Sequence, residues 1–586
     1  MLFQELAAVY DQVEAKSSRL EMTDLLADFF KTADCSSLHR IIYLTQGQLY
    51  PDFYPQKLGI ADKLMLRTLA MSSGLNEARI QDIWLKEGDP GIVAQKAFQT
   101  RRQQTLFSDP LTLDRVYGNL ECIAKAEGSG SQDTKMKLLA ELLNDAQPNE
   151  AKFICRIVTG RMRLGVASMT VVDALAVAFA SKAERDLIER AFNISSDLGK
   201  VAEVLCSKGI DAVGEMKVEV GSPMRAMLAE RLPSAQEILE RLGGKAGLEY
   251  KYDGVRVQAH IQDGEVQLFS RRLEDLTSQF PDVVRSLKKA FRAESAIVEG
   301  ECVPVDLNTG ELLPFQEVSH RRGRKHGLES AIEDYPVRVF LFDCVYKDGE
   351  DLTNRPYLER RAILQECFEP TEDVRFSEMR LLDNQADVEK FFQQALQDGC
   401  EGLMAKSVDD SSFYRAGSRG YLWIKYKKEY RSEMTDTVDL VVVGGFAGRG
   451  KRAGVYGALL MATYNDELDV FETVCKLGSG FDDATLAKLP ELLEGFKVGA
   501  KHPKVVSKMD ADFWFEPAIV LEVLGAEITI SPIHTTAYGK VRKDSGLAIR
   551  FPRFTGKFRE DKTVREATTT KELEEMHSRQ LKKIEG

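Results

Sequence analysis

The sequence lacks the features of a membrane or secreted protein. No apolar run is long enough to span a bilayer. The first residues, Met1–Leu6, do not have the basic start and apolar stretch of a secretory signal. We therefore expect a cytoplasmic protein with no membrane partner.

Paired cysteine motifs are also missing. The nine cysteines are scattered over 586 residues and none forms a Cys-x-x-Cys pair. This spacing argues against a zinc ribbon or a disulfide framework and suits a reducing cytoplasm. We expect most of the cysteines to be small buried apolar residues.

The chain lacks an excess of positive charge, since its net charge is −12. That value is unusual for a protein that binds nucleic acid, but local clusters matter more than the total. Nine Lys or Arg face three Asp or Glu between Lys540 and Arg565. Two further clusters are Arg321, Arg322, Arg324 and Lys325, and Arg419, Lys425, Lys427, Lys428 and Arg431. A single cluster is usually a solvated face, whereas three together favour a phosphate-binding surface.

The length predicts three or four domains. Apolar residues have helical spacing from residue 1 to about 205, and strand-like alternation is scarce there. Short strands then mix with helices to about 430, and strands dominate beyond about 435. We expect an all-α region at 1–210, an α+β region at 211–430 and a small β-barrel at 431–586. An OB-fold suits the size of the barrel, although the pattern leaves the barrel type open.

The run from Lys251 to Arg256, Lys-Tyr-Asp-Gly-Val-Arg, carries the most chemistry. Lys-x-Asp-Gly-x-Arg is the signature of enzymes that hold a nucleotide covalently on lysine. Alone, the run also fits a plain strand and turn. Alternation after it predicts a hairpin that turns at Asp263-Gly264, with Arg256 on the face opposite Val255. A lysine is only about 0.04% neutral at pH 7, so a nucleophilic Lys251 needs burial or nearby cations.

Further segments downstream contain chemically suitable residues. They supply a possible phosphate ligand (Arg271), a carboxylate pair on one strand face (Glu299, Glu301), a strand aromatic (Phe342), a carboxylate and lysine (Glu401, Lys406), and a basic strand running from Arg419 to Lys427 with Trp423, Lys425 and Lys427 on one face. Each has an ordinary reading by itself, such as a surface carboxylate, a core aromatic or a charged strand edge. Their order after Lys251 favours a single site.

Taken together, these motifs resemble the ATP-dependent DNA ligases, specifically the archaeal and eukaryotic replicative type. The resemblance covers nearly the whole chain. It includes the lysine motif, the segments with Glu301 and Phe342, Glu401–Lys406, Trp423–Lys425, and a C-terminal run ending at Arg559–Lys562. The helical N-terminal region, including Gly160–Gly165, is similar to the family's DNA-binding domain. Length favours an archaeal-type member.

The resemblance implies a multidomain fold. Residues 1–210 would form an all-α DNA-binding domain, residues 211–430 an ATP-grasp-like adenylation (nucleotidyltransferase) domain, and residues 431–586 a β-barrel OB-fold domain. The function implied is nick sealing in duplex DNA through a lysine–AMP intermediate, in replication, repair and recombination. ATP is the cosubstrate, Mg²⁺ the metal and nicked double-stranded DNA the partner, for a monomeric enzyme.

By the same resemblance, Lys251 is the catalytic nucleophile that takes AMP from ATP. The implied nucleotide ligands are Glu249 at the adenine amino group, Phe342 stacked on the ring, Glu301 near the nucleotide, and Arg256, Arg271, Arg419 and Lys425 on ribose and phosphates. Glu301 and Glu401 are the implied metal ligands. Separately, Gln103–Phe107 resembles a short peptide that binds a sliding clamp, or is a loop between two helices.

Three other interpretations share part of this pattern. An mRNA capping guanylyltransferase uses the same lysine chemistry but lacks a helical region of about 200 residues. An NAD-dependent ligase usually has a four-cysteine zinc finger. A DNA-binding scaffold with a decayed lysine motif is disfavoured by the intact motifs. Transfer of label from ATP, rather than GTP, to Lys251 would discriminate among them.

Overall fold

The computed structural model describes residues 1–100, 109–305, 312, 313, 315, 318, 321, 332, 335–427, 436–448, 454–525, 527–550 and 552–585. Packing divides the chain into two compact units. One comprises Met1–Thr68 and Gln103–Arg431, and the other comprises Leu69–Arg102 and Ser432–Gly586. Gln103–Phe107, the segment that resembles a clamp-binding peptide, lies outside the described residues.

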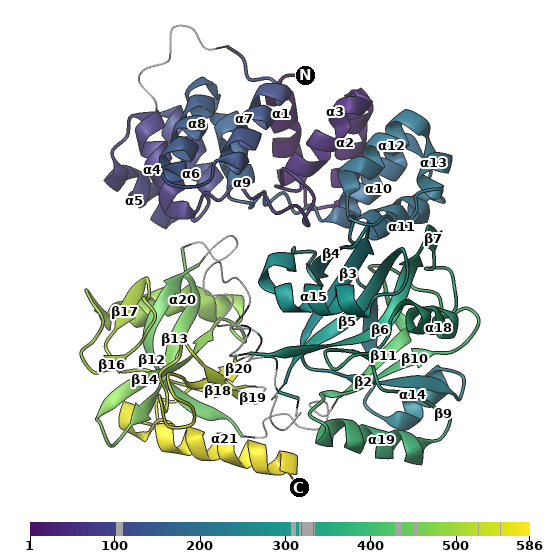
Figure 1. Ribbon diagram of the computed structural model, residues 1–586. Helices are drawn as coiled ribbons and strands as arrows, with labels where there is room; N and C mark the ends of the chain where they lie inside the picture. Colours follow the sequence, from purple (N-terminus) through teal and green to yellow (C-terminus); the bar gives the residue numbers. More distant parts are fainter. Residues whose placement is uncertain are drawn as a thin grey trace. The chain divides into compact units, whose positions relative to one another are not determined.

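Helices account for the regular structure up to residue 214, as the apolar spacing predicts (Figure 1). Polar N-caps begin several of them: Asn76, Asp89, Thr112 and Asp197 accept backbone N–H groups of the first turn. The helices are α1 (Phe3–Glu14), α2 (Arg19–Thr32), α3 (Cys35–Thr45), α4 (Asp62–Ser73), α5 (Glu77–Glu87), α6 (Pro90–Gln99), α7 (Leu113–Lys125), α8 (Ser131–Asp145), α9 (Pro148–Val158), α10 (Ser168–Phe179), α11 (Arg185–Ser195), α12 (Leu198–Lys208) and α13 (Ile210–Gly214).

The cysteine prediction is wrong at one pair. Cys35 at the start of α3 and Cys206 in α12 form a disulfide, with their Cα atoms 5.5 Å apart. The two positions are 171 residues apart in sequence, so no spacing motif reveals them. Of the remaining cysteines, Cys122 is exposed and the other six are buried, as expected for small apolar residues.

Two sheets form the centre of the chain. The first has the order β1-β11-β10-β2-β9 and the second the order β4-β3-β5-β6-β7, with β8 also paired to β6. Their strands are β1 (Leu228–Arg231), β2 (Ala246–Lys251), β3 (Val255–Gln262), β4 (Glu265–Ser270), β5 (Ser295–Pro304), β6 (Val337–Lys347), β7 (Glu350–Asp351), β8 (Val374–Phe376), β9 (Met379–Leu382), β10 (Gly402–Ser407) and β11 (Arg419–Lys427). Helices α14 (Ala235–Arg241), α15 (Pro281–Ala290), α18 (Tyr357–Cys367) and α19 (Gln385–Gln397) accompany them.

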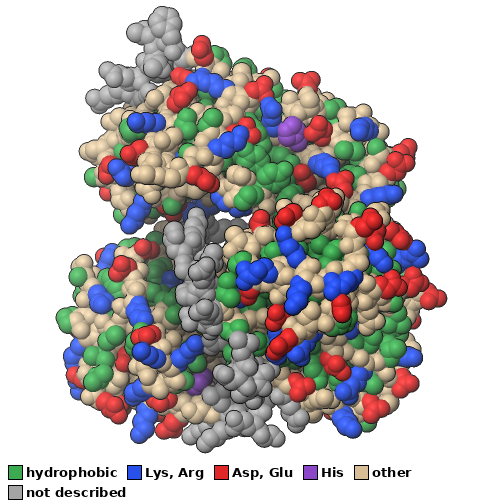
Figure 2. All heavy atoms as spheres, in the orientation of Figure 1, with side chains coloured by type: hydrophobic (Ala, Val, Ile, Leu, Met, Phe, Trp, Pro, Cys, Tyr) green, Lys and Arg blue, Asp and Glu red, His purple; other side chains and the backbone are tan. Residues whose placement is uncertain are grey.

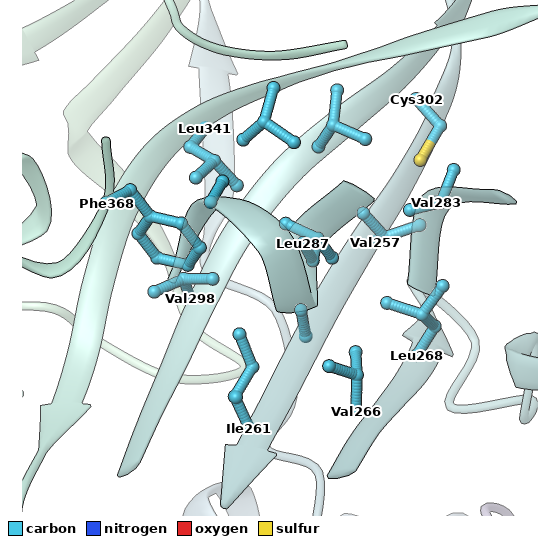
Figure 3. Packing of buried hydrophobic residues seen from close by; sticks show 14 of the residues in the cluster. Val257, Ile261, Val266, Leu268, Val283, Leu287, Val298, Cys302, Leu341 and Phe368 are labelled. Atoms are coloured by element: carbon cyan, nitrogen blue, oxygen red, sulfur yellow. The ribbon is translucent and has the colours of Figure 1, made fainter. Parts of the chain in front are cut away.

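The predicted hairpin after Lys251 is confirmed. Strands β3 and β4 pair antiparallel, and Asp263 and Gly264 both have positive φ at the turn, as a two-residue hairpin loop requires. Val257 and Ile261 point from β3 into a buried apolar cluster, where they meet residues of β5, β6 and α15 (Figure 3). Since side chains alternate along a strand, Arg256 faces the other way.

A strand-rich segment follows residue 436. Its eight-stranded sheet has the path β15-β17-β12-β13-β14-β16, with β18 joining β12 to β21, and β19 and β20 form a separate pair. The elements are β12 (Val438–Ala447), β13 (Tyr456–Asn465), β14 (Val470–Leu477), α20 (Asp483–Glu494), β15 (Lys497–Val498), β16 (Val505–Val506), β17 (Phe513–Phe515), β18 (Val520–Leu524), β19 (Glu527–Ser531), β20 (Gly546–Arg550), β21 (Arg553–Phe558) and α21 (Thr570–Glu585). The described strands form an open sheet, so the small β-barrel that the spacing predicts is not confirmed.

Acidic and basic side chains are interspersed over the surface that Figure 2 shows. One residue of the predicted basic clusters is not on the surface at all. Arg321 is buried, forms an ion pair with Asp282 and lies over the ring of Phe280. Arg322, Arg324, Lys325, Lys428 and Arg431 lie outside the described residues. Among the helices that are described, each is too short or too polar to cross a lipid bilayer.

Candidate active site

Strand pairing places Lys251 beside a second lysine and a carboxylate. Lys251 ends β2, and Gly402 of β10 lies between Lys251 on one side and Lys427 of β11 on the other. Glu401 directly precedes Gly402. Its Oε2 atom forms ion pairs with the ammonium groups of both lysines, and Lys427 Nζ lies 2.8 Å from it. Burial would raise the pKa of Glu401, but Lys251 and Lys427 lower it below its ordinary value.

Two further carboxyl groups face this cluster. Burial, with a contribution from Glu401, raises the pKa of Asp253 to about 6. Burial also raises the pKa of Glu301 to about 7, although the positive charge of Lys251 partly offsets this rise. These acids repel one another when ionised, and a divalent cation would relieve that repulsion.

The carboxylates suit Mg²⁺, which takes oxygen ligands from one or two acidic side chains and keeps several of its waters. In the described part of the chain, no three His, Cys, Asp or Glu side chains form a ready-made metal cage. Glu301 and Glu401, with Asp253 close to them, offer carboxylate oxygens of the kind that a partly hydrated Mg²⁺ accepts.

Arg256 is held rigidly by a buried carboxylate. Its guanidinium is 2.8 Å from Glu299 of β5, which also accepts a hydrogen bond of 2.8 Å from the Tyr414 hydroxyl. Glu299 is 1% exposed, so this ion pair is buried and holds Arg256 in place, unlike a mobile contact at the surface. The two strand positions Glu299 and Glu301 share one face, as alternation predicts, opposite Gln258 and Arg256 of β3.

Phe342 lies next to cationic and aromatic groups. The Arg256 guanidinium is 5.3 Å and the Lys406 ammonium 4.9 Å from the centre of its ring. Trp423 of β11 packs edge-on against it, with ring centres 6.2 Å apart. The aromatic side chain predicted to stack on a base is thus only partly covered by its neighbours.

Glu249 is buried beneath this group of side chains. Lys406 Nζ is 2.8 Å from one of its oxygens, and Arg361 Nη1 is 2.7 Å from the other, which also accepts the Tyr357 hydroxyl. Lys406 Nζ additionally donates to the backbone oxygen of Phe342 at 3.4 Å. Lys406 therefore connects Glu249 to Phe342.

Three of the predicted phosphate ligands lie farther along. Burial, followed by the charges of Arg231, Lys427 and Lys251, lowers the pKa of Lys425 to about 8. Burial and then the positive charges of Arg256 and Arg419 lower the pKa of Arg271. Arg419 lines a cavity of about 530 Å³ with Arg241, Arg415 and Tyr421, among other residues.

The structure thus gathers Lys251, Glu301, Glu401, Arg256 and Phe342 around one centre. Arg271, Arg419 and Lys425 are within electrostatic reach of it, and Glu249 joins it through Lys406. Sequence reasoning gave no individual role to Asp253, Glu299, Tyr357, Arg361 or Lys406. Alternation and motif position marked all of these except Tyr357 and Arg361, which belong to a helix with no motif.

Comparison with known proteins identifies the family. Family models match residues 226–427 (ATP dependent DNA ligase domain), 2–176 (DNA ligase N terminus) and 452–562 (ATP dependent DNA ligase C terminal region). DNA ligase 2 of Thermofilum pendens is 53% identical over 98% of this chain and 97% of its own length. The chain belongs to the ATP-dependent DNA ligases. It is an archaeal-type member, as the motifs predict, and it is an enzyme that seals nicks in DNA.

Other relatives agree with this assignment. The DNA ligase of Caldivirga maquilingensis is 49% identical over 99% of this ligase and 98% of its own length. A solved structure named Pmar-Lig_Pre. is 16% identical, covers 95% of this chain and 99% of its own, and has a TM-score of 0.54, a likeness of fold alone. The helical N-terminal part, the central adenylation domain and the sheet-rich C-terminal part are those of a multidomain ligase.

Proposed function

We propose that Lys251 is the nucleophile of this ligase and carries AMP during the reaction. The observation that supports this role most directly is its position: the amine ends a rigid strand, hydrogen-bonded to Glu401 and close to Lys425 and Lys427. The neutral amine is the form that attacks phosphorus, and this strand position holds it next to the carboxylate of Glu401.

The remaining site residues have binding roles in this proposal. Phe342 stacks on the adenine ring, worth about 1–3 kcal/mol by analogy with base–aromatic contacts. Glu249 accepts a hydrogen bond from the adenine amino group. Arg256, Arg271, Arg419 and Lys425 bind ribose and phosphate oxygens, for which in-line positioning and neutralisation of charge are the main requirements.

Glu301 and Glu401 are the proposed ligands of Mg²⁺. When bound, the ion neutralises charge on the phosphate oxygens. Glu401 has a second task, because its contacts with Lys251 and Lys427 hold both ammonium groups in place.

Three successive transfers at phosphorus complete the reaction. Lys251 Nζ forms a bond to the α-phosphorus of ATP as the bond to the β-phosphate oxygen breaks, and the amine loses a proton while pyrophosphate leaves. An oxygen of the 5′-phosphate of a nick then bonds to the phosphorus of AMP as the bond from that phosphorus to Lys251 Nζ breaks, and the released amine regains a proton. Finally the 3′-hydroxyl attacks that 5′-phosphorus, a phosphodiester forms and AMP leaves.

The domain division at 1–210, 211–430 and 431–586 belongs to the same proposal, with an OB-fold in the last part. Within it, Arg559 and Lys562 both pair with Asp439 at the start of β12, at 2.8 and 2.6 Å. Arg559–Lys562 resembles the C-terminal motif by which the family's last domain acts on the nucleotide.

Nicked duplex DNA is the proposed polynucleotide substrate, bound through phosphates and with little dependence on base sequence. Arg241, Arg415 and Arg419 around the 530 Å³ cavity provide local positive charge despite the net charge of −12. A monomeric, cytoplasmic enzyme and an interaction of Gln103–Phe107 with a sliding clamp are further parts of the proposal.

A bypass experiment tests the role of Lys251. Lys251→Ala should fail to seal an ordinary 5′-phosphate nick with ATP, but should still join a nick that already carries AMP, because that step does not use the amine. Lys245→Ala, an exposed lysine just before β2, should seal both substrates. Sealing of the ordinary nick by Lys251→Ala would contradict the proposal.

A further inference from the structure

Helix α18 supplies two buried donors to Glu249. Tyr357 and Arg361 lie one helical turn apart on the buried face of α18, and both donate to the same carboxylate oxygen, Arg361 at 2.7 Å. Arg361 also donates through Nη2 to the backbone oxygen of Ser377, so its planar fork has a fixed orientation. The orientation of Glu249 is therefore set by α18 as well as by its own strand.

Counting hydrogen bonds shows what Glu249 can still accept. A carboxylate has about four acceptor positions. Tyr357 and Arg361 take two on one oxygen, and Lys406 takes one on the other at 2.8 Å. Among the described residues, this leaves one acceptor position unoccupied, on the oxygen that faces Lys406, whose ammonium also bonds to the backbone of Phe342.

The donors of α18 determine which acceptor positions of Glu249 are occupied. Burial, with the negative charge of Glu249, holds the pKa of the Tyr357 hydroxyl well above its ordinary value, so the hydroxyl stays a donor. Burial opposes the charge of Arg361, but Glu249 raises its pKa beyond the usual value. A fixed acceptor favours a purine with an amino group at position 6 and disfavours one with a carbonyl group there, because two acceptors would then face each other.

The same helix also fixes the strand that carries Phe342. Arg360, next to Arg361, binds both oxygens of Asp343 at 2.8 and 2.9 Å, and neither side chain is exposed. Asp343 directly follows Phe342 in β6. One helix thus holds the carboxylate of β2 and the aromatic strand β6 in register, although β2 and β6 belong to different sheets.

We infer that Tyr357 and Arg361 are positioning residues that make the nucleotide site selective for a 6-aminopurine triphosphate. They do so through Glu249, without touching the nucleotide. The inference rests on the proposed function, in which Glu249 accepts the adenine amino group and Lys251 becomes adenylylated.

The test compares two nucleotides on the full-length enzyme. The rate of nucleotidyl transfer to Lys251 is measured against the concentration of ATP and of purine ribonucleoside triphosphate, which lacks the 6-amino group. Wild type should favour ATP in kcat/KM by about tenfold or more, the usual effect of one hydrogen bond to a charged group. Tyr357→Phe should reduce the preference to about threefold or less by raising the KM for ATP, with the KM for the analogue unchanged.

Tyr250→Phe is the matched control. Tyr250 lies on the same strand as Glu249, and its hydroxyl also donates to a carboxylate. The acceptor is Asp398, at 2.6 Å, instead of Glu249. This variant should keep the wild-type preference. Arg361→Gln should reduce the preference as Tyr357→Phe does, and Tyr357→Phe decides the matter if the buried Arg361 substitution prevents folding.

The outcomes separate the two proposals. An unchanged preference in Tyr357→Phe, an equal loss with both nucleotides, or a wild type without preference would overturn the role of α18. Failure of wild-type enzyme to label at Lys251 would instead overturn the proposed function. A reduced preference in Tyr357→Phe, together with the wild-type preference in Tyr250→Phe, supports the inference.

Discussion

Glu301 shows how burial changes the chemistry available to a single side chain. Its pKa of about 7, raised chiefly by burial, leaves it partly protonated at neutral pH, whereas an exposed glutamate is ionised. A proton on Glu301 competes with a metal ion for the same oxygen. The residue is therefore sensitive to pH in the range where the enzyme would be assayed.

This sensitivity predicts a pH-dependent first step. With Mg²⁺ below saturation, the rate of adenylylation should fall about tenfold from pH 8 to pH 6 as Glu301 is protonated. More Mg²⁺ should move the profile to lower pH, since the ion displaces the proton. Single-turnover labelling with ATP measures this, and a profile that is flat between pH 6 and 8, or unmoved by Mg²⁺, would contradict the assignment of Glu301.

At this scale the sequence indicated which residue types to examine but not their state. Motif order placed Lys251, Glu301, Phe342 and Glu401 in one site. It could not give the pKa of Glu301, because burial and the proximity of Asp253 and Glu401 depend on strand pairing between distant segments.

Among the elements, the turn between β2 and β3 depends on close backbone packing. A Cβ atom at Gly254 would lie 2.9 Å from the carbonyl carbon of Cys302 in β5 and 3.1 Å from Glu301 Cγ, with the Cys302 oxygen nearer still. The two nearest atoms belong to the backbone of Cys302, which cannot move aside as a flexible side chain could. Glycine is thus required by the approach of β5, which holds the turn that follows Lys251.

Gly254→Ala should therefore slow adenylylation by about 100-fold, the effect of displacing a reacting group by about 1 Å. Gly264→Ala, in the hairpin turn with φ +73° and no atom within 4 Å, is the control: it should cost about 1 kcal/mol of stability and leave the labelling rate near wild type. Equal labelling rates for the two variants would show that the packing of Gly254 is unimportant.

The disulfide between α3 and α12 gives a second prediction for the elements. It closes a loop with a sequence separation of 171, and the chain-entropy model gives a stabilisation of about 5 kcal/mol as an upper limit. Reduction should lower the melting temperature measured by calorimetry. Cys35→Ser should melt like the reduced protein, and Cys122→Ser, at an exposed free cysteine, like the oxidised one. A melting curve that is the same with and without reductant would contradict a structural disulfide.

Elements were predictable where local pattern determines them. Alternation and Asp263-Gly264 specified the β3–β4 hairpin, and apolar spacing specified the helices before residue 214. The pairing of Cys35 with Cys206 and the role of α18 depend on contacts between segments far apart in sequence, which periodicity does not encode.

For the whole molecule, the sequence predicted the order of its parts: helices, then mixed sheets and helices, then a strand-rich segment. The barrel expected from strand spacing is not confirmed, because spacing does not determine whether a sheet closes, and the described strands of that segment form an open sheet. Net charge was a poor guide to the partner of a DNA ligase, because basic side chains can gather locally on an acidic protein, as Arg241, Arg415 and Arg419 do around one cavity.

The central claim is that the Lys251 amine bonds to the α-phosphorus of ATP, and mass spectrometry tests it directly. Enzyme incubated with ATP and Mg²⁺ should gain about 329 Da, one adenylyl group, on the peptide that contains Lys251. Acid should remove the adduct, and Lys251→Ala should not form it. An adenylyl group on a different residue, or on the Lys251→Ala protein, would contradict the claim.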